Sequence, residues 1–464
     1  MDPRTRVLLE APIGSTLLRL AMPNMLVMVA QAGAGLVETY FIGKLGTDAL
    51  AGVALVFPVV MLMQMMSAGA IGGGIASSIA RALGGGRRAD ANALALHALV
   101  ISLTLGAVFT VALVGGGRWL YQAMGGNGRA LDAALTYSNW IFAGALLVWL
   151  FNSLGAVLRG TGNMAFPAAV SCIGVVFLVP VSPALIFGWG PFPALGIAGG
   201  AVALVSYYVL GCLAFFAYLW SGRSVLHPSL RAVRFRWLFF RDILRVGAVA
   251  AVVTVATNIT IIIGTAFVGE FGAAAIAGYG TGARLEYLLV PLVFGLGAPL
   301  VAIVGTSIGA GQRERALRGA WLGAAMAFIL TEAIGLCAAA FPMAWLSLFD
   351  TDPQMLEAGA IYLRTVGPFY GMFGLALSLY FASQGAGRLL WPLVGTVARL
   401  AIAALAGGLA LRWTDELSYV FLAQSLGLIA SGLINLVAVA AGAWFGSLTW
   451  PWSTAAVLQR RSPT

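Results

Sequence analysis

The sequence predicts an all-α polytopic membrane protein with twelve transmembrane helices in two six-helix bundles. Of its 464 residues 61% are hydrophobic and 9% charged, and apolar runs recur from end to end. A soluble protein cannot bury that much apolar surface. Gly and Ala occur throughout the runs, which favours closely packed helices over the alternating strands of a β-barrel. An internal repeat, described below, predicts the two bundles.

Polar or Gly/Pro-rich breaks divide the apolar runs into twelve expected helices. Their ranges are 13–43, 47–80, 90–116, 132–158, 164–189, 194–221, 239–268, 273–307, 316–345, 356–383, 389–411 and 417–445. The first run contains Pro23, Asn24 and Gln31 and is too long for the apolar part of a signal peptide, so we expect it to be a retained span. Arg residues concentrate in alternate turns, as at Arg87 and Arg88, which predicts that both termini are cytoplasmic.

The chain repeats itself. "FIGKLGTDALAG" from Phe41 matches "FVGEFGAAAIAG" from Phe267 at an offset of 226, and "GGGRRADA" from Gly84 matches "GAGQRERA" from Gly309 at 225. The offset of 225 also pairs Tyr137 with Tyr362. Six helices per repeat give both halves one orientation, related by a pseudo-two-fold axis along the membrane normal. This architecture is typical of an alternating-access transporter.

These boundaries predict five segments. They are a cytoplasmic N-terminal segment (1–12), an N-terminal six-helix lobe (13–221), a basic cytoplasmic linker (222–238), a C-terminal six-helix lobe (239–445) and a cytoplasmic tail (446–464).

Composition also argues against other functions. The net charge of +10 comes mainly from Arg in short loops, which indicates membrane topology and not nucleic-acid binding. The Gly-rich turns lack the Lys-Ser/Thr ending of a phosphate loop, and the two histidines have no metal-ligand or catalytic companion. We therefore expect no enzyme, no cofactor and no bound structural metal.

Several motifs resemble the multidrug and toxic compound extrusion (MATE) family of efflux antiporters. They are Pro23 and Gln31, "GLVETYFIGKLGTDALAG", "ARALGGGRRADA", "VLRGTGNMAFP", "LIFGWGPFPALGIAGGAVA" and "GAPLVAIVGTSIGAGQRERA", in the order and spacing of the family across about residues 12–445. The resemblance implies export of amphipathic, cationic organic compounds in exchange for H⁺, with Na⁺ as the alternative. It also implies a multi-pass protein of the cytoplasmic (inner) membrane of a prokaryote, and we expect a monomer surrounded by membrane lipid.

This chain departs from the family at two places. The family usually has Asp where this chain has Glu38, and many proton-linked members carry Asn and Asp in the fifth span, where Leu178 and Ser182 stand here. The repeat places Gly264 at the position of Glu38 in the second half, so this carboxylate belongs to one half alone. We expect ion coupling to depend mainly on Glu38, with a Na⁺ site near it as the alternative.

Glu38 lies in an apolar span, where an ionised carboxylate is costly, so it can hold a proton and release it when water enters. Snorkelling to the headgroups is the alternative interpretation. Gln31 lies two helical turns earlier on the same face. We predict a cavity lined by Gln31, Tyr137, Asn139, Asn152, Ser182 and Met63, and hinges at Pro23, Pro180 and Pro183. Each of the polar residues has a structural alternative, in which it only ties helices together.

Two further acids lie within spans. Glu286 is expected to form a structural ion pair with Arg399 or Arg364, and Glu332 has no evident partner, so a second proton site is one interpretation of it. Two alternative functions stay open at this point. A flippase for lipid-linked sugars would need several cationic residues in its cavity, and a membrane enzyme would need a cluster of His, acid or Cys residues at one depth.

Overall fold

The computed structural model describes residues 2–229, 235–349, 351–414 and 416–445, with only the backbone described at Leu36. These residues form helices and turns, and none of them lies in a strand. The middle of the predicted linker, 230–234, and the predicted tail, 446–464, lie outside the described residues. The chain divides into two compact units, one made of the chain up to Leu8 with Arg19–Gly247, the other of Leu9–Leu18 with the chain from Ala248 onward.

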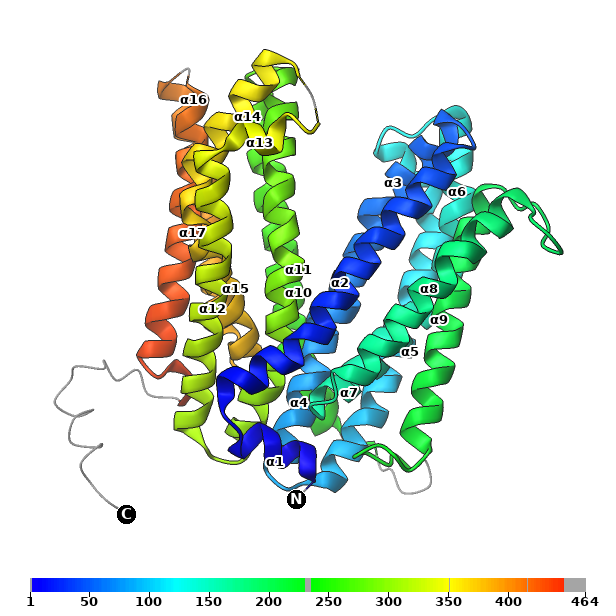
Figure 1. Cartoon of the computed structure of the whole chain (residues 1–464), viewed down its shortest axis with the longest axis vertical. Helices are drawn as coiled ribbons and strands as arrows, with labels where there is room; N and C mark the ends of the chain where they lie inside the picture. Colours follow the sequence, from blue (N-terminus) through cyan, green and yellow to red (C-terminus); the bar gives the residue numbers. More distant parts are fainter. Residues whose placement is uncertain (1, 230–234, 350, 415, 446–464) are drawn as a thin grey trace. The chain divides into compact units, whose positions relative to one another are not determined.

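The first half of the chain forms nine α-helices and one π-helix among its described residues (Figure 1). They are α1 (Pro3–Glu10), α2 (Ile13–Gly43), α3 (Thr47–Gln64), the π-helix η1 (Met65–Ile71), α4 (Gly72–Gly84), α5 (Arg88–Ala123), α6 (Gly128–Ala143), α7 (Ala145–Gly160), α8 (Ala165–Phe187) and α9 (Ile197–Trp220).

The second half begins with α10, and its long helices run side by side within their unit (Figure 1). Its elements are α10 (Trp237–Gly269), α11 (Ala273–Gly309), α12 (Arg313–Ala340), α13 (Pro342–Leu346), α14 (Pro353–Val366), the 3-10 helix η2 (Gly367–Phe369), α15 (Tyr370–Ala386), α16 (Leu390–Trp413), α17 (Leu417–Ala440) and the 3-10 helix η3 (Ala443–Phe445).

The two units pack equivalent helices in the same pairs. In the first unit α3 packs on α6, α5 on α7 and α8 on α9, and in the second α11 packs on α14, α12 on α15 and α16 on α17. Small residues allow these contacts: a Cβ on Gly52 would lie 2.7 Å from the backbone nitrogen of Ala134, and one on Gly278 would lie 2.7 Å from that of Gly359. The sequence repeat is therefore also a structural repeat.

The turns between helices repeat in the same register. Gly46 and Gly272, which follow the first helix of each half, have φ of 114° and 98°, a region that glycine adopts without a steric penalty. After the second span the backbone nitrogen of Arg87 donates to the carbonyl of Ala82 at 2.9 Å, and that of Gln312 donates to Ser307 at 2.9 Å. These are the six-residue closures of Schellman motifs, and they explain why "GGGRR" and "GAGQR" recur without a nucleotide function.

Five of the helices predicted as continuous are interrupted. The predicted helix 316–345 breaks at Phe341 between α12 and α13, and the predicted helix 417–445 is α17, a turn and η3. The predicted helix 132–158 is α6 and α7, which bend by 48° at Gly144, and the predicted helix 356–383 is α14, η2 and α15. The predicted helix 47–80 contains η1, whose seven residues follow a π-helical path. Eleven helices of the described chain are long and apolar enough to cross a membrane, and the bent α6–α7 pair brings the number to twelve.

The compact units do not separate at the predicted linker. The first ten or so residues of α10 belong to the first unit, where a Cβ on Gly74 would lie 2.7 Å from the carbonyl oxygen of Ile243. Arg81 on α4 forms an ion pair with Asp242 at 2.9 Å, which also ties the start of α10 to this unit. Correspondingly, Arg315 donates to the carbonyl of Ala11 at 2.5 Å, within the second unit.

Candidate functional site: two glutamate centres

The carboxylate of Glu38 lies near the C-terminal end of α2, inside the first unit. The hydroxyl of Tyr137 on α6 donates a hydrogen bond of 3.0 Å to its Oε1. A Cβ on Gly200 of α9 would lie 3.2 Å from the same oxygen and 3.6 Å from Ile42. Glycine at this position therefore leaves room for the carboxylate. Tyr137 is 6% exposed. Glu38 therefore points into the helical unit. The structure does not show the alternative, in which the side chain only snorkels toward the headgroups.

The other predicted neighbours of Glu38 lie at different places. Gln31 and Asn139 are exposed, and among the described contacts neither is recorded in a hydrogen bond to Glu38. Gln31 and Ser171 lie close to the hydroxyl of Tyr207, which finds no well-formed hydrogen bond in the described chain. Ser182 on α8 is 3% exposed, and its hydroxyl also has no recorded partner there. Of the residues predicted around Glu38, Tyr137 is therefore the one recorded at hydrogen-bond distance from it.

Asn152 belongs to a second polar group, which lies on α7 and around the π-helix. Its Nδ2 donates to Oε1 of Gln64 at 2.9 Å and to Oγ of Ser67 at 2.8 Å. Gln64 in turn donates to the hydroxyl of Tyr208. Met63, predicted to contact substrate, is fully buried in the core. Sequence reasoning missed Gln64 and Tyr208, although Gln64 is the polar residue in the run "VVMLMQMM".

The predicted hinge prolines lie within continuous helices. Pro23 is inside α2, and Pro180 and Pro183 are inside α8. Pro183 is buried, whereas Pro180 is exposed. Proline removes one backbone hydrogen bond from a helix and so permits bending there, and the hinge role stays a prediction.

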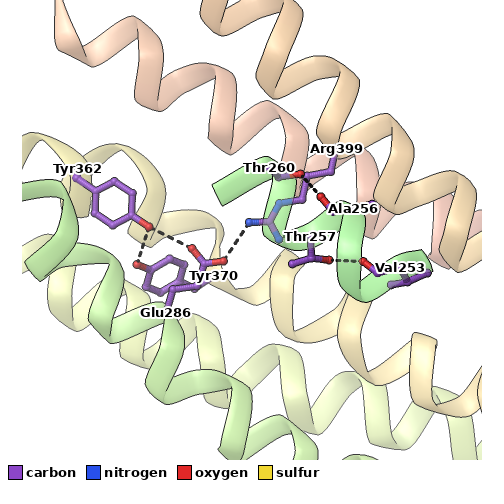
Figure 2. A network of polar contacts seen from close by, with 8 residues as sticks. All are labelled: Val253, Ala256, Thr257, Thr260, Glu286, Tyr362, Tyr370 and Arg399. Atoms are coloured by element: carbon purple, nitrogen blue, oxygen red, sulfur yellow. Dashed lines mark hydrogen bonds and ion pairs between the residues drawn. The ribbon is translucent and has the colours of Figure 1, made fainter. Parts of the chain in front are cut away.

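Glu286 on α11 forms the centre of a network in the second unit. Arg399 on α16 donates to its Oε1 at 3.0 Å, and the hydroxyl of Tyr362 on α14 donates to its Oε2 at 3.1 Å (Figure 2). The hydroxyl of Tyr370 donates to that of Tyr362 at 3.4 Å. The ion pair predicted for Glu286 is confirmed with Arg399, while Arg364 is exposed in the last turn of α14.

Glu332 on α12 has a partner that the sequence does not indicate. Its Oε2 accepts a hydrogen bond of 2.6 Å from the backbone nitrogen of Gly371, in the first turn of α15. Pro368 lies in η2, just before this turn, where the span is interrupted. A carboxylate at the first turn of a helix satisfies a free N–H group and complements the helix dipole. This geometry supports a capping role for Glu332 more than a second proton site.

The two glutamate centres use equivalent tyrosines and non-equivalent acids. Tyr137 and Tyr362 occupy the same position of the repeat, yet Glu38 lies on α2, the first long helix of its half, and Glu286 on α11, the second long helix of its half. In the register of 225, the position of Arg399 in the first half is Gly174. Glu38 therefore has a hydroxyl partner and no recorded cationic one among the described residues, whereas Glu286 is paired with a guanidinium.

The chain was compared with known families and proteins. The MatE family model matches residues 23–184 and 250–408, which is more than half of the chain. The FAD transporter of Shewanella oneidensis is 29% identical over 405 residues, covering 85% of this chain and 87% of that protein. The probable multidrug resistance protein NorM of Thermotoga maritima is 26% identical over 391 residues, covering 83% of each.

Solved structures share the fold. A crystal structure of MATE in the bent conformation superposes with a TM-score of 0.87 at 23% identity, covering 94% of this chain and 96% of that one. A transporter of the MOP superfamily from Pyrococcus furiosus, described as having a binding pocket of reversed polarity, gives a TM-score of 0.86 at 23% identity with the same coverage.

Proposed function

Because the chain belongs to the MatE family, the multidrug and toxic compound extrusion transporters, we propose that it exports organic compounds in exchange for protons carried by Glu38. The chain is a multi-pass membrane transporter, and its family is not one of enzymes. The observation that carries the proposal is the Glu38 carboxylate, half-buried inside the first unit with the Tyr137 hydroxyl at 3.0 Å. Of the acids within the spans, Glu286 is neutralised by Arg399 and Glu332 caps a helix, which leaves Glu38 for exchange.

The proton acts by changing the hydrogen bonding of Glu38. As a carboxylate, Glu38 accepts from Tyr137, and once protonated it becomes a donor itself and needs a different arrangement of its neighbours. Substrate release toward the outside then accompanies protonation, and return of the unit accompanies deprotonation toward the cytoplasm. One proton moving down a potential of 100 mV releases about 2.3 kcal/mol, enough for roughly a fifty-fold gradient of a neutral solute.

A proton suits this site better than Na⁺. A hard cation takes several oxygen ligands. In the described residues Glu38 has one recorded side-chain partner, and His, Cys, Asp or Glu side chains gather nowhere there in groups of three or more. We further propose a place in the cytoplasmic membrane with both termini inside, since Arg residues concentrate in alternate turns.

Transport in everted membrane vesicles tests this role. An imposed pH gradient drives uptake of a fluorescent amphipathic cation by the wild type, and a Na⁺ gradient alone does not. Glu38→Gln loses pH-driven uptake, and Glu38→Asp retains a reduced rate because the carboxylate is kept on a shorter arm. Asp132→Asn removes an exposed acid from the helix that carries Tyr137 and serves as the matched control. Uptake by Glu38→Gln at the wild-type rate would overturn the proposal.

Two substrate classes are supported by different observations. Amphipathic cations are the substrates that the resemblance to the efflux family implies. An anionic flavin nucleotide is the second candidate, because a relative at 29% identity is named as an FAD transporter. Competition between FAD and the fluorescent cation in the same vesicles distinguishes them: inhibition by FAD at micromolar concentration favours the flavin, and no inhibition favours the cation.

A further inference from the structure

A small cavity lies beside the Glu286–Arg399 pair, within the second unit. Its volume is about 30 Å³, which is room for one small ion or one to two water molecules. The helices that border it are α10, α11, α16 and α17. The lining residues are Thr260, Ile261, Tyr279, Ala283, Glu286, Tyr287, Arg399, Ala403 and Gln424.

The repeat explains why two polar side chains approach α10 beside this cavity. Gly264 stands where the first half has Glu38, one helical turn beyond Thr260 on α10. A Cβ on Gly264 would lie 2.9 Å from Nε2 of Gln424 and 3.3 Å from the hydroxyl of Tyr279. In the first half this position carries an acid, and in the second half the absent side chain lets Gln424 and Tyr279 approach the backbone of α10 closely.

The carboxylate beside the cavity is already engaged in hydrogen bonds. Oε1 of Glu286 accepts from Arg399 and Oε2 accepts from Tyr362 (Figure 2). The guanidinium held at Glu286 disfavours a cation in the cavity, because the two positive charges would repel each other.

The donors around the cavity are not all used. Nε2 of Gln424 is buried and has no hydrogen-bond partner in the described part of the chain. Arg399 has five N–H donors, and its recorded bond to a side chain within the described residues is the one from Nη2 to Glu286. A buried donor without an acceptor is unfavourable, so the cavity favours an occupant that only accepts.

We propose that this cavity binds a single anionic atom, held by Gln424 and Arg399. The atom is either a free halide such as chloride or one oxygen of a carboxylate or phosphate group. Charge-assisted hydrogen bonds from a guanidinium and an amide suit both sources. The inference concerns binding alone and stands independently of the transported compound and of Glu38.

The line width of the ³⁵Cl NMR signal tests it. Purified full-length protein in detergent is titrated with sodium chloride, with methanesulfonate added to keep the ionic strength constant. Surface arginines bind chloride too, so the informative quantity is the difference between the wild type and Gln424→Leu, which keeps the size of the side chain but removes the donor. Gln354→Leu changes an exposed glutamine on α14 of the same unit and serves as the matched control.

We expect the wild type and Gln354→Leu to share a saturable broadening whose chloride affinity falls about tenfold or more in Gln424→Leu. Gly264→Ala, whose Cβ would displace Nε2 of Gln424, weakens the same component. Competition with sodium acetate distinguishes the two sources of the anionic atom. If acetate abolishes the broadening, the site also accepts carboxylate oxygens, and if acetate has no effect, the site is specific for halides. Equal broadening in the wild type and both cavity variants would overturn the proposal. A wild type without any saturable component would also overturn it, because the cavity would then hold only water.

Discussion

Tyr137 and Tyr362 stand 225 residues apart at the same position of the repeat, and each donates a hydrogen bond to a glutamate, at 3.0 Å and 3.1 Å. The glutamates come from different helices of their halves, and only that of Tyr362 also pairs with arginine. Duplication thus preserved the hydroxyl and changed its partner. The two tyrosines offer a matched pair for separating ion coupling from structural stabilisation.

Removal of each hydroxyl separates the two centres. Tyr137→Phe should lower pH-driven uptake by about ten- to a hundredfold, because a hydrogen bond to a charged group contributes roughly 1.5–3 kcal/mol. Tyr362→Phe should leave the dependence of uptake on the pH gradient unchanged, since Glu286 keeps its bond from Arg399. The measurement is the initial rate of uptake in vesicles that contain equal amounts of protein. Equal losses in both variants would contradict the assignment of coupling to the first centre.

The Glu286–Arg399 pair should matter for stability. The side chains are 18% and 15% exposed, so loss of the arginine leaves a largely buried charge. We expect Arg399→Gln to lower the free energy of unfolding by about 3–5 kcal/mol. Thermal unfolding in detergent measures it.

The double variant provides the control. Arg399→Gln combined with Glu286→Gln removes both charges and should recover most of the loss, because replacing a whole buried pair is often close to neutral. A double variant as unstable as the single one would mean that the pair is not the source of the effect.

Glu332 should act as a helix cap. Glu332→Leu leaves the backbone N–H group of Gly371 without its acceptor and should cost about 1–3 kcal/mol in thermal unfolding experiments. Glu332→Gln keeps an acceptor oxygen and should lose less than about 1 kcal/mol. Both variants should retain coupling to the pH gradient. Loss of coupling in both variants, with the Gln variant as stable as expected, would instead identify Glu332 as a second proton site.

His97 should hold the start of α10. The ring is fully buried, its Nε2 accepts from the backbone nitrogen of Arg236 at 3.0 Å, and Phe240 packs against it at 4.5 Å between ring centroids. His97→Phe keeps an aromatic ring and loses the acceptor, so hydrogen exchange of residues 235–240 should become several-fold faster. Mass spectrometry of deuterated peptides measures it. The exposed His227 provides the control, as His227→Phe should leave these amides unchanged, and unaltered exchange in both variants would refute the role.

Helix number and the repeat were predictable from sequence because long apolar runs and equal offsets do not depend on tertiary contacts. The same register placed Tyr137 and Tyr362, and charge alone suggested the pair of Glu286 with an arginine. The interruptions at Gly144, at η2 and at Met65–Ile71 were not predictable, because each lies inside an apolar run with no polar break.

Parts of the candidate site were also beyond the sequence. The cap formed by Glu332 depends on a backbone group 39 residues away, exposed by the interruption at Pro368. Asn152 was expected near Glu38, but in the structure its side chain bonds to Gln64 and Ser67 instead. The direction in which a side chain leaves its helix is not readable from spacing alone. The close approach of Gln424 to α10 depends on the side chain that Gly264 lacks, and a missing group leaves no signal of its own in a single sequence.

Proton release on substrate binding tests the role of Glu38 most directly. If substrate and proton compete at this carboxylate, addition of substrate to purified protein in weakly buffered solution must release protons. The account predicts release of up to about one proton per bound substrate by the wild type and by Glu286→Gln, and none by Glu38→Gln, with a pH-sensitive dye as the readout. Substrate binding with undiminished proton release in Glu38→Gln would contradict it.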